Sequence, residues 1–192
     1  MNLVYIHGAS ASADSFNYIR HHLNHPAETV IEYNSYHGFK NNLNRMRETI
    51  SQSRDSIFFV AHSLGGIYAL HLAQHFFNRV AGAVTLSTPY GGCREAVFAQ
   101  FFLPFNQLMR DISPGSEPMS SVPKMSVPKR WTNVVTTCGS SPFIAAPNDG
   151  VVTVDSMTHL SDQMELVFSE STHYEVVLSP ETVNIIKQNL TN

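Results

Sequence analysis

The chain has 192 residues, of which 43% are hydrophobic and 14% charged, and its formal net charge is −3. This length and composition suit one globular domain with a sizeable core and are short for two domains. The slightly acidic balance excludes the basic footprint that nucleic-acid binding requires. The sequence also contains no 18-residue apolar run, so we expect no transmembrane segment.

The start of the chain and its two cysteines bear on location. A strand is expected by Leu3, directly after Met1-Asn2, which leaves no room for a signal peptide. Cys93 and Cys138 have no metal-ligand or CxxC spacing. We therefore expect reduced thiols in a cytoplasmic protein, with a processed secreted form as the alternative.

Strand-like and helix-like segments alternate along the chain, which predicts a parallel sheet covered by helices. The apolar runs expected to be strands are residues 3–6, 29–33, 57–61, 80–86, 133–137 and 165–168. Helices are expected at about 15–23, 42–53, 64–77 and from Pro180 onward, where Ser179 is a helix N-cap and Pro180 suits the first helical position. The prediction is a single α/β domain over residues 1–192 with a reduced, mostly parallel sheet of about six strands.

The segment from about 90 to 130 breaks this alternation. It begins with Gly91-Gly92, continues with a phenylalanine-rich stretch, and then holds prolines at 114, 118, 123 and 128. The proline spacing predicts an extended connection with little regular structure of its own.

Residues 60–66, Val-Ala-His-Ser-Leu-Gly-Gly, directly follow the apolar run 57–59. A strand, a serine flanked two residues away by small residues, and a helix form the nucleophile-elbow pattern. Ala61 and Gly65 supply the small residues, and the helix N-terminus directs its dipole at Ser63. The alternative is that Ser63 only caps the helix. His62 should point away from the substrate as a structural residue or a wall of the pocket.

A nucleophilic serine needs a base, an acid that orients the base, and donors for the oxyanion. Asp149 and His173 each follow a predicted strand, and the carboxyl ends of parallel strands meet at one edge of the sheet. Asp149 also suits a turn, and Asp155 and Asp162 are the alternative candidates for the acid. His159 is the alternative to His173 as the base. The oxyanion donors are expected to be the backbone N–H groups of Ala9, after the His7-Gly8 pair, and Leu64.

Five motifs in this order resemble the α/β-hydrolase superfamily, and within it the small, minimal lipases and esterases of bacteria. They are His7-Gly8, residues 61–66, Ser87-Thr88-Pro89-Tyr90-Gly91-Gly92, Asp149-Gly150-Val151-Val152 and His173. The resemblance covers nearly the whole chain. It implies a Ser63–His173–Asp149 triad that cleaves a small-molecule acyl ester without a metal or other cofactor.

The resemblance leaves two questions open. The implied reaction is carboxylic ester hydrolysis through an acyl-enzyme, with thioester cleavage or acyl transfer as the alternative and a non-catalytic binding protein as a third hypothesis. The family inserts a substrate cap at about 90–130, where aromatic side chains would line an acyl pocket with His62; the other interpretation is a helix packed into the core. These side chains are Phe98, Phe101, Phe102 and Phe105.

One histidine group suggests metal binding only weakly. His21 and His25 are one helical turn apart, with His22 between them, but Pro26 follows and no carboxylate or cysteine completes a site. A solvated helix end is the interpretation we adopt.

Overall fold

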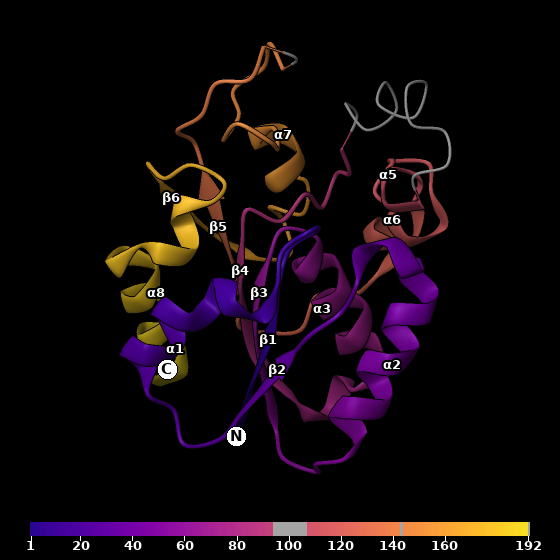
Figure 1. Cartoon of the computed structure of the whole chain (residues 1–192), viewed down its shortest axis with the longest axis vertical. Coiled ribbons are helices and arrows are strands. Elements are labelled where there is room, and N and C mark those ends of the chain that lie inside the picture. The colour runs from indigo at the N-terminus through magenta and orange to yellow at the C-terminus, as the bar shows by residue number, and fades with distance from the viewer. Residues whose placement is uncertain (94–106, 143, 192) are drawn as a thin grey trace.

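The computed structural model describes residues 1–93, 107–142 and 144–191. At its centre lies a six-stranded sheet in the order β2-β1-β3-β4-β5-β6, in which every neighbouring pair is parallel (Figure 1). The strands are β1 (Asn2–Ile6), β2 (Glu28–Ile31), β3 (Ile57–His62), β4 (Val80–Leu86), β5 (Trp131–Thr136) and β6 (Glu165–Ser169). The prediction of a mostly parallel sheet of about six strands is confirmed.

Two pairs of helices cover the two faces of this sheet (Figure 1). On one face lie α2 (Phe39–Ser51) and α3 (Leu64–His75), and on the other lie α1 (Asn17–Leu23) and α8 (Pro180–Thr191). Short 3-10 helices lie next to these elements. Those at Ala13–Phe16 and Glu175–Leu178 precede α1 and α8, the one at Phe77–Arg79 follows α3, and the one at Ser35–His37 precedes α2.

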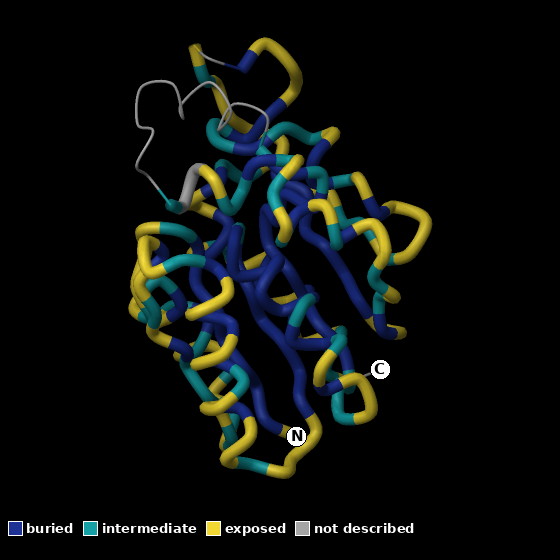
Figure 2. The backbone as a smooth tube through the Cα atoms, turned by 90° about the vertical axis from the view of Figure 1, so that its right-hand side faces the viewer, coloured by how far each residue is buried: buried dark blue, intermediate teal, exposed yellow. Residues whose placement is uncertain are grey.

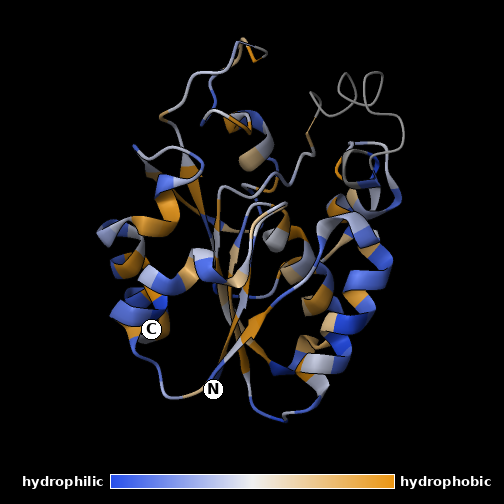
Figure 3. Ribbon diagram, in the orientation of Figure 1, coloured by the Kyte–Doolittle hydropathy of each residue, from blue (hydrophilic) through white to orange (hydrophobic). Residues whose placement is uncertain are grey.

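The four inner strands β1, β3, β4 and β5 are buried on both faces, as expected for a parallel sheet between helices, whereas the edge strands β2 and β6 are partly exposed (Figure 2). Alternate residues of each strand point to opposite layers: Val4 and Phe59 join the core beneath α2 and α3, whereas Leu3 and Phe58 join the core beneath α1 and α8. The outer face of α2 is hydrophilic (Figure 3), whereas most residues of α3 are buried. Central strands this deeply packed form a rigid base for the loops at their carboxyl ends.

At two strand boundaries that differ from the prediction, the neighbouring strand sets the boundary. The second strand stops at Ile31 rather than residue 33, because its neighbour β1 ends at Ile6, the register partner of Ile31. Beyond that point Tyr33 donates its backbone N–H to the His7 side chain instead of to a strand. The fifth strand begins at Trp131, two residues early, because Trp131 already pairs with Ala83.

Two helix starts show what sequence can and cannot reveal. The prediction for the last helix is confirmed: Ser179 Oγ accepts the N–H of Glu181, and Pro180 occupies the first position. The second helix begins at Phe39, three residues before the predicted start. There the Phe39 N–H donates to the Asp111 carboxylate, so a residue 72 positions away stabilises the helix N-terminus.

The prediction of little regular structure between 90 and 130 is wrong for residues 107–124. That part contains α5 (Gln107–Asp111), α6 (Glu117–Ser121) and a 3-10 helix at Val122–Lys124. Pro118 and Pro123 both sit in the first turn of their helix, where a missing N–H costs no hydrogen bond. The four phenylalanines at 98–105 lie outside the described residues. No helix among the described residues is long and apolar enough to cross a membrane.

Candidate active site

Ser63 occupies the sharp turn between β3 and α3. Its backbone angles are φ +52° and ψ −123°, outside the range of ordinary non-glycine residues. A Cβ on Gly65 would lie 2.1 Å from the carbonyl oxygen of Ile6, so α3 presses directly on the end of β1. Only glycine at position 65 lets the helix start this close to the sheet, which is the geometry of the nucleophile elbow.

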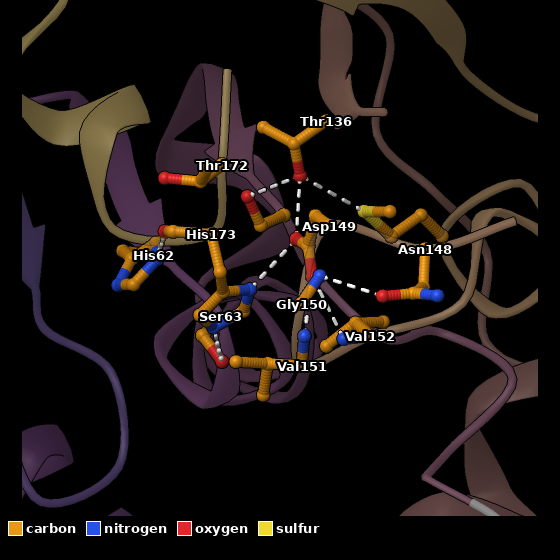
Figure 4. A network of polar contacts seen from close by, with 12 residues as sticks. His62, Ser63, Thr136, Asn148, Asp149, Gly150, Val151, Val152, Thr172 and His173 are labelled. Carbon is orange, nitrogen blue, oxygen red and sulfur yellow. Dashed lines mark hydrogen bonds and ion pairs between the residues drawn. The ribbon is translucent and has the colours of Figure 1, made fainter. Parts of the chain in front are cut away.

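His173 brings its imidazole to this serine from the loop after β6. Its Nε2 atom lies 3.1 Å from Ser63 Oγ, and its Nδ1 atom lies 2.8 Å from Asp149 Oδ2 (Figure 4). Asp149 comes from the loop between β5 and α7 (Val154–Met157). Because a carboxylate only accepts hydrogen bonds, Nδ1 carries the imidazole proton and Nε2 presents its lone pair to Ser63.

The Asp149 carboxylate is buried, with 1% of the residue exposed, and both of its oxygens are bonded. Oδ1 accepts the backbone N–H groups of Val151 and Val152, while Oδ2 accepts the hydroxyl of Thr136 as well as His173 Nδ1–H. Burial by itself would raise the pKa of Asp149, but the hydrogen bonds from His173, Thr136 and Val152 together hold this pKa below its ordinary value. The carboxylate is therefore ionised at neutral pH.

A second histidine fixes the loop that carries His173. The Nε2–H of His62 donates to the backbone carbonyl of His173 at 2.8 Å, and the two ring centroids lie 4.8 Å apart (Figure 4). Burial is the largest cause that lowers the pKa of His62, to about 3, and the electrostatic interaction with His173 is the next, so His62 is neutral at neutral pH. Only 4% of His62 is exposed.

The backbone after β1 passes close to the elbow. A Cβ on Gly8 would lie 2.9 Å from His62 Nδ1 and 3.2 Å from Ser63 Cβ, so the absent side chain allows this approach. His7 Nδ1 lies 2.8 Å from the carbonyl oxygen of Gly8, which fixes the peptide group that carries the N–H of Ala9. Leu64 is the first residue of α3, where a backbone N–H has no partner within the helix. Both predicted oxyanion donors thus belong to backbone next to Ser63.

The alternative candidates for the acid and the base lie away from Ser63. Asp155 is exposed in the first turn of α7, and Asp162 and His159 are exposed in the segment that precedes β6. Of the three aspartates, Asp149 alone bonds His173. The structure therefore brings together Ser63, His173 and Asp149.

The other polar candidates form no cluster with these three. His22 and His25 each bond a nearby backbone carbonyl through Nδ1, and no group of three or more His, Cys, Asp or Glu side chains within the described ranges could hold a metal ion. Cys138 is exposed and Cys93 is half-buried, both as thiols.

Sequence reasoning missed two hydroxyl groups behind Asp149. Thr136 ends β5 and bonds the carboxylate, and Ser87, directly after β4, bonds Thr136. Ser87 is the first residue of one of the five motifs in the sequence, although no role is assigned to it there; the signal for Thr136 is a hydroxyl residue at the carboxyl end of a strand. A cavity of about 960 Å³ could not be foreseen either. It lies between α2 and the α5–α6 segment, and none of Ser63, Asp149 and His173 lines it.

Comparison with solved structures places the fold among the α/β hydrolases. The mature form of lipase BlEst2 from Bacillus licheniformis superposes with a TM-score of 0.77 at 16% identity, covering 98% of this chain and 91% of that one. A metagenomic carboxyl esterase, MGS0156, gives 0.80 at 17% identity over 100% and 76%. Est816, described as an N-acyl homoserine lactone degrading enzyme, gives 0.66 at 14% identity over 98% and 92%.

These identities establish a common fold and leave the reaction to the site. No curated protein sequence matches the chain. A family model described as serine hydrolase, however, matches residues 3–176, which is most of the chain and includes Ser63, Asp149 and His173. The chain belongs to the serine hydrolase family.

Proposed function

We propose that this protein hydrolyses carboxylic esters, with Ser63 as nucleophile, His173 as general base and acid, and Asp149 as the group that orients His173. One observation carries the proposal: an unbroken line of hydrogen bonds runs from the buried Asp149 carboxylate through His173 to Ser63 Oγ. The hydroxyl sits on a strained turn at a helix N-terminus, where substrate can reach it.

The reaction follows from this geometry in two halves. Ser63 Oγ–H passes its proton to His173 Nε2 while Oγ bonds to the ester carbonyl carbon. The carbon–oxygen bond to the alcohol then breaks, and the proton on Nε2 leaves with the alcohol. Water repeats the sequence on the acyl-enzyme, so that a carboxylic acid departs and Ser63 regains its proton. Throughout, ionised Asp149 holds the Nδ1 proton and stabilises the imidazolium.

The oxyanion of each tetrahedral intermediate is assigned to the N–H groups of Ala9 and Leu64. Both lie on backbone that is fixed before substrate arrives, by the His7 contact and by the start of α3 respectively. Preorganised donors of this kind matter because the loss of one typically costs about 10²–10³ in rate.

The names of the structural relatives support ester-type substrates without choosing among them. A lipase, a carboxyl esterase and an enzyme that degrades N-acyl homoserine lactones share the fold. The phenylalanines at 98–105, which the sequence predicts to line an acyl pocket, lie outside the described residues. We propose a small or medium acyl ester as substrate.

The test is hydrolysis of p-nitrophenyl esters from acetyl to palmitoyl by the wild type and by Ser63→Ala. We expect turnover by the wild type and a loss on the order of 10⁶-fold in the variant. Thermal unfolding should change little, because alanine keeps the Cβ and removes one hydroxyl. Ser120→Ala is the control, because it removes an exposed helical hydroxyl that donates to the backbone carbonyl of Glu117.

Labelling with a fluorophosphonate probe separates the possible outcomes. An active Ser63→Ala protein would overturn the assignment of the nucleophile. A wild type that is labelled at Ser63 but hydrolyses no ester would overturn ester hydrolysis. Thioester cleavage and acyl transfer to an acceptor other than water would then be the reactions to test. A wild type that is neither labelled nor active would overturn catalysis at this site.

A further inference from the structure

Asp149 Oδ2 accepts a hydrogen bond from His173 Nδ1–H and a second one from an uncharged donor, the hydroxyl of Thr136. We propose that Thr136, itself held by Ser87, is a positioning residue for the triad: it fixes the Asp149 carboxylate so that His173 keeps the orientation needed to act on Ser63. This inference rests on the proposed function for its kinetic consequences, but its geometry is independent of the substrate.

The direction of every proton in this network can be assigned. Thr136 Oγ1 lies 2.6 Å from Asp149 Oδ2, and because the ionised carboxylate only accepts, Thr136 must donate. Its single proton is then used, so its contact with Ser87 Oγ at 2.8 Å has Ser87 as the donor. The Met157 sulfur, 3.5 Å from Thr136 Oγ1, is left as a weak contact. Ser87 therefore donates to Thr136, and Thr136 donates to Asp149 Oδ2. The same oxygen also accepts the Nδ1–H of His173.

The sheet topology explains why these groups meet. Strands β3, β4 and β5 are neighbours, and at their carboxyl ends stand Ser63, Ser87 and Thr136 respectively. Ser87 and Thr136 are both completely buried. Ser87 also has a left-handed backbone with φ +51°, which is unusual for serine, while its N–H donates to Val134 on β5. The fold thus holds Ser87 in a strained conformation that aims its hydroxyl at Thr136.

A carboxylate needs two fixed oxygens to keep its plane, because rotation about the bond to the carboxyl group is soft. Backbone N–H groups of Val151 and Val152 hold Oδ1. On Oδ2 the donors are Thr136 and His173 itself, so Thr136 is the one that stays fixed while the imidazole gains and loses a proton. Without that hydroxyl, the one donor left to Oδ2 among the described residues is His173, the group that Asp149 orients.

The test compares Thr136→Val, which keeps the shape and removes the hydroxyl, with Thr136→Ser, which restores it. We expect Thr136→Val to lower kcat on p-nitrophenyl acetate about tenfold, the scale of one hydrogen bond to a charged group, with KM unchanged. Thr136→Ser should recover most of kcat. The matched control is Thr132→Val on the same strand, since the buried Thr132 hydroxyl bonds Glu165 and Asn189, away from the site.

A proton NMR signal separates positioning from general stability. The Nδ1–H of His173, bonded to Asp149, should resonate far downfield in the resting enzyme, shift in Thr136→Val and return in Thr136→Ser, while Thr132→Val leaves it in place. Ser87→Ala should give a smaller loss of kcat, and its effect should largely vanish in the Thr136→Val background, because Ser87 acts through Thr136.

Three results would overturn the proposal: wild-type kcat and an unmoved Nδ1–H signal in Thr136→Val, equal losses in the Val and Ser variants, or losses that only track thermal unfolding as in Thr132→Val. Failure of the proposed function is a different result, in which the wild type shows no turnover that depends on Ser63. The NMR comparison still decides the role of Thr136 in that case, because it needs no substrate.

Discussion

The loops that carry Asp149 and His173 and the segment that carries α5 and α6 lie on the same domain but are held in different ways. In the first region hydrogen bonds reach both carboxylate oxygens, both loops and the backbone between them, since His173 N–H also donates to the Asp149 carbonyl. In the second, the chain borders a cavity of about 960 Å³ and is tied to α2 and α3 by isolated bonds and by buried Met119 and Val122.

This difference indicates a division of roles. Groups that must keep a fixed distance to a reacting atom are preorganised by several bonds each, because a small displacement there costs rate. A segment beside an open cavity needs only enough contacts to stay folded. Changes in the loops of Asp149 and His173 should therefore alter kcat, whereas changes in the α5–α6 segment should alter stability.

Within the loops that carry Asp149 and His173, the largest effect is expected from Asp149→Asn. The N–H groups of Val151 and Val152 require an oxygen at the Oδ1 position, so the new amide nitrogen must replace Oδ2 and present its protons to His173. His173 then carries its proton on Nε2 and can no longer accept one from Ser63. We expect a loss of kcat of about 10⁴-fold in a protein that remains folded, measured with p-nitrophenyl acetate.

The control for this substitution is Asp155→Asn, a rival aspartate that is exposed at the start of α7. It should retain full activity. If Asp155→Asn were the inactive variant and Asp149→Asn the active one, the assignment of the acid would be reversed.

A smaller effect is expected in the pH dependence of stability, through His62. Its pKa is about 3 in the folded protein and about 6.5 when unfolded, so between these values the unfolded chain binds the extra proton. The free energy of unfolding should therefore fall as the pH drops below 6.5, by about 1.4 kcal/mol per pH unit from this group. His71, whose pKa burial also lowers, adds to the same slope, and Asp149 adds to it only below its unfolded pKa of 3.8.

Urea denaturation from pH 7.5 to 4 measures this slope. In His62→Gln the amide can still donate to the His173 carbonyl but cannot titrate, so the slope should become shallower by the contribution of His62 while that of His71 remains. Identical slopes in the two proteins would show that His62 is not the buried titrating group that the structure indicates.

Comparing the sequence with the structure shows which kinds of information a single chain carries. The strands and the helices that cover them follow from apolar periodicity. The positions of Ser63, Asp149 and His173 after strands β3, β5 and β6 follow from the parallel topology. Such features depend on local residues and on one general rule, that strand carboxyl ends share an edge.

The features that were missed depend on pairs far apart in the chain. The start of α2 depends on Asp111, 72 residues away, and the His62 contact with the His173 carbonyl spans 111 residues. Thr136 and Ser87 are a hydroxyl pair 49 residues apart that no spacing rule marks. In each case the partner is chosen by tertiary packing, which sequence patterns do not encode directly.

The smallest effect is expected in the α5–α6 segment, from Asp111→Ala. Asp111 accepts the N–H of Phe39 at the start of α2 and the side-chain amide of Gln107, so alanine removes the cap that joins the two elements. We expect a loss of about 1 kcal/mol in the free energy of unfolding, the usual cost of losing a helix cap, with kcat on p-nitrophenyl acetate unchanged.

The control here is Asp162→Ala, an exposed aspartate with no hydrogen bond or ion pair to any residue that the structure describes, for which stability should be unchanged. If Asp111→Ala left stability intact but lowered kcat as far as Thr136→Val does, the α5–α6 segment would have to help position the reacting groups. The two regions would then be mechanically coupled across the Phe39 contact, rather than divided between chemistry and folding as their hydrogen bonds indicate.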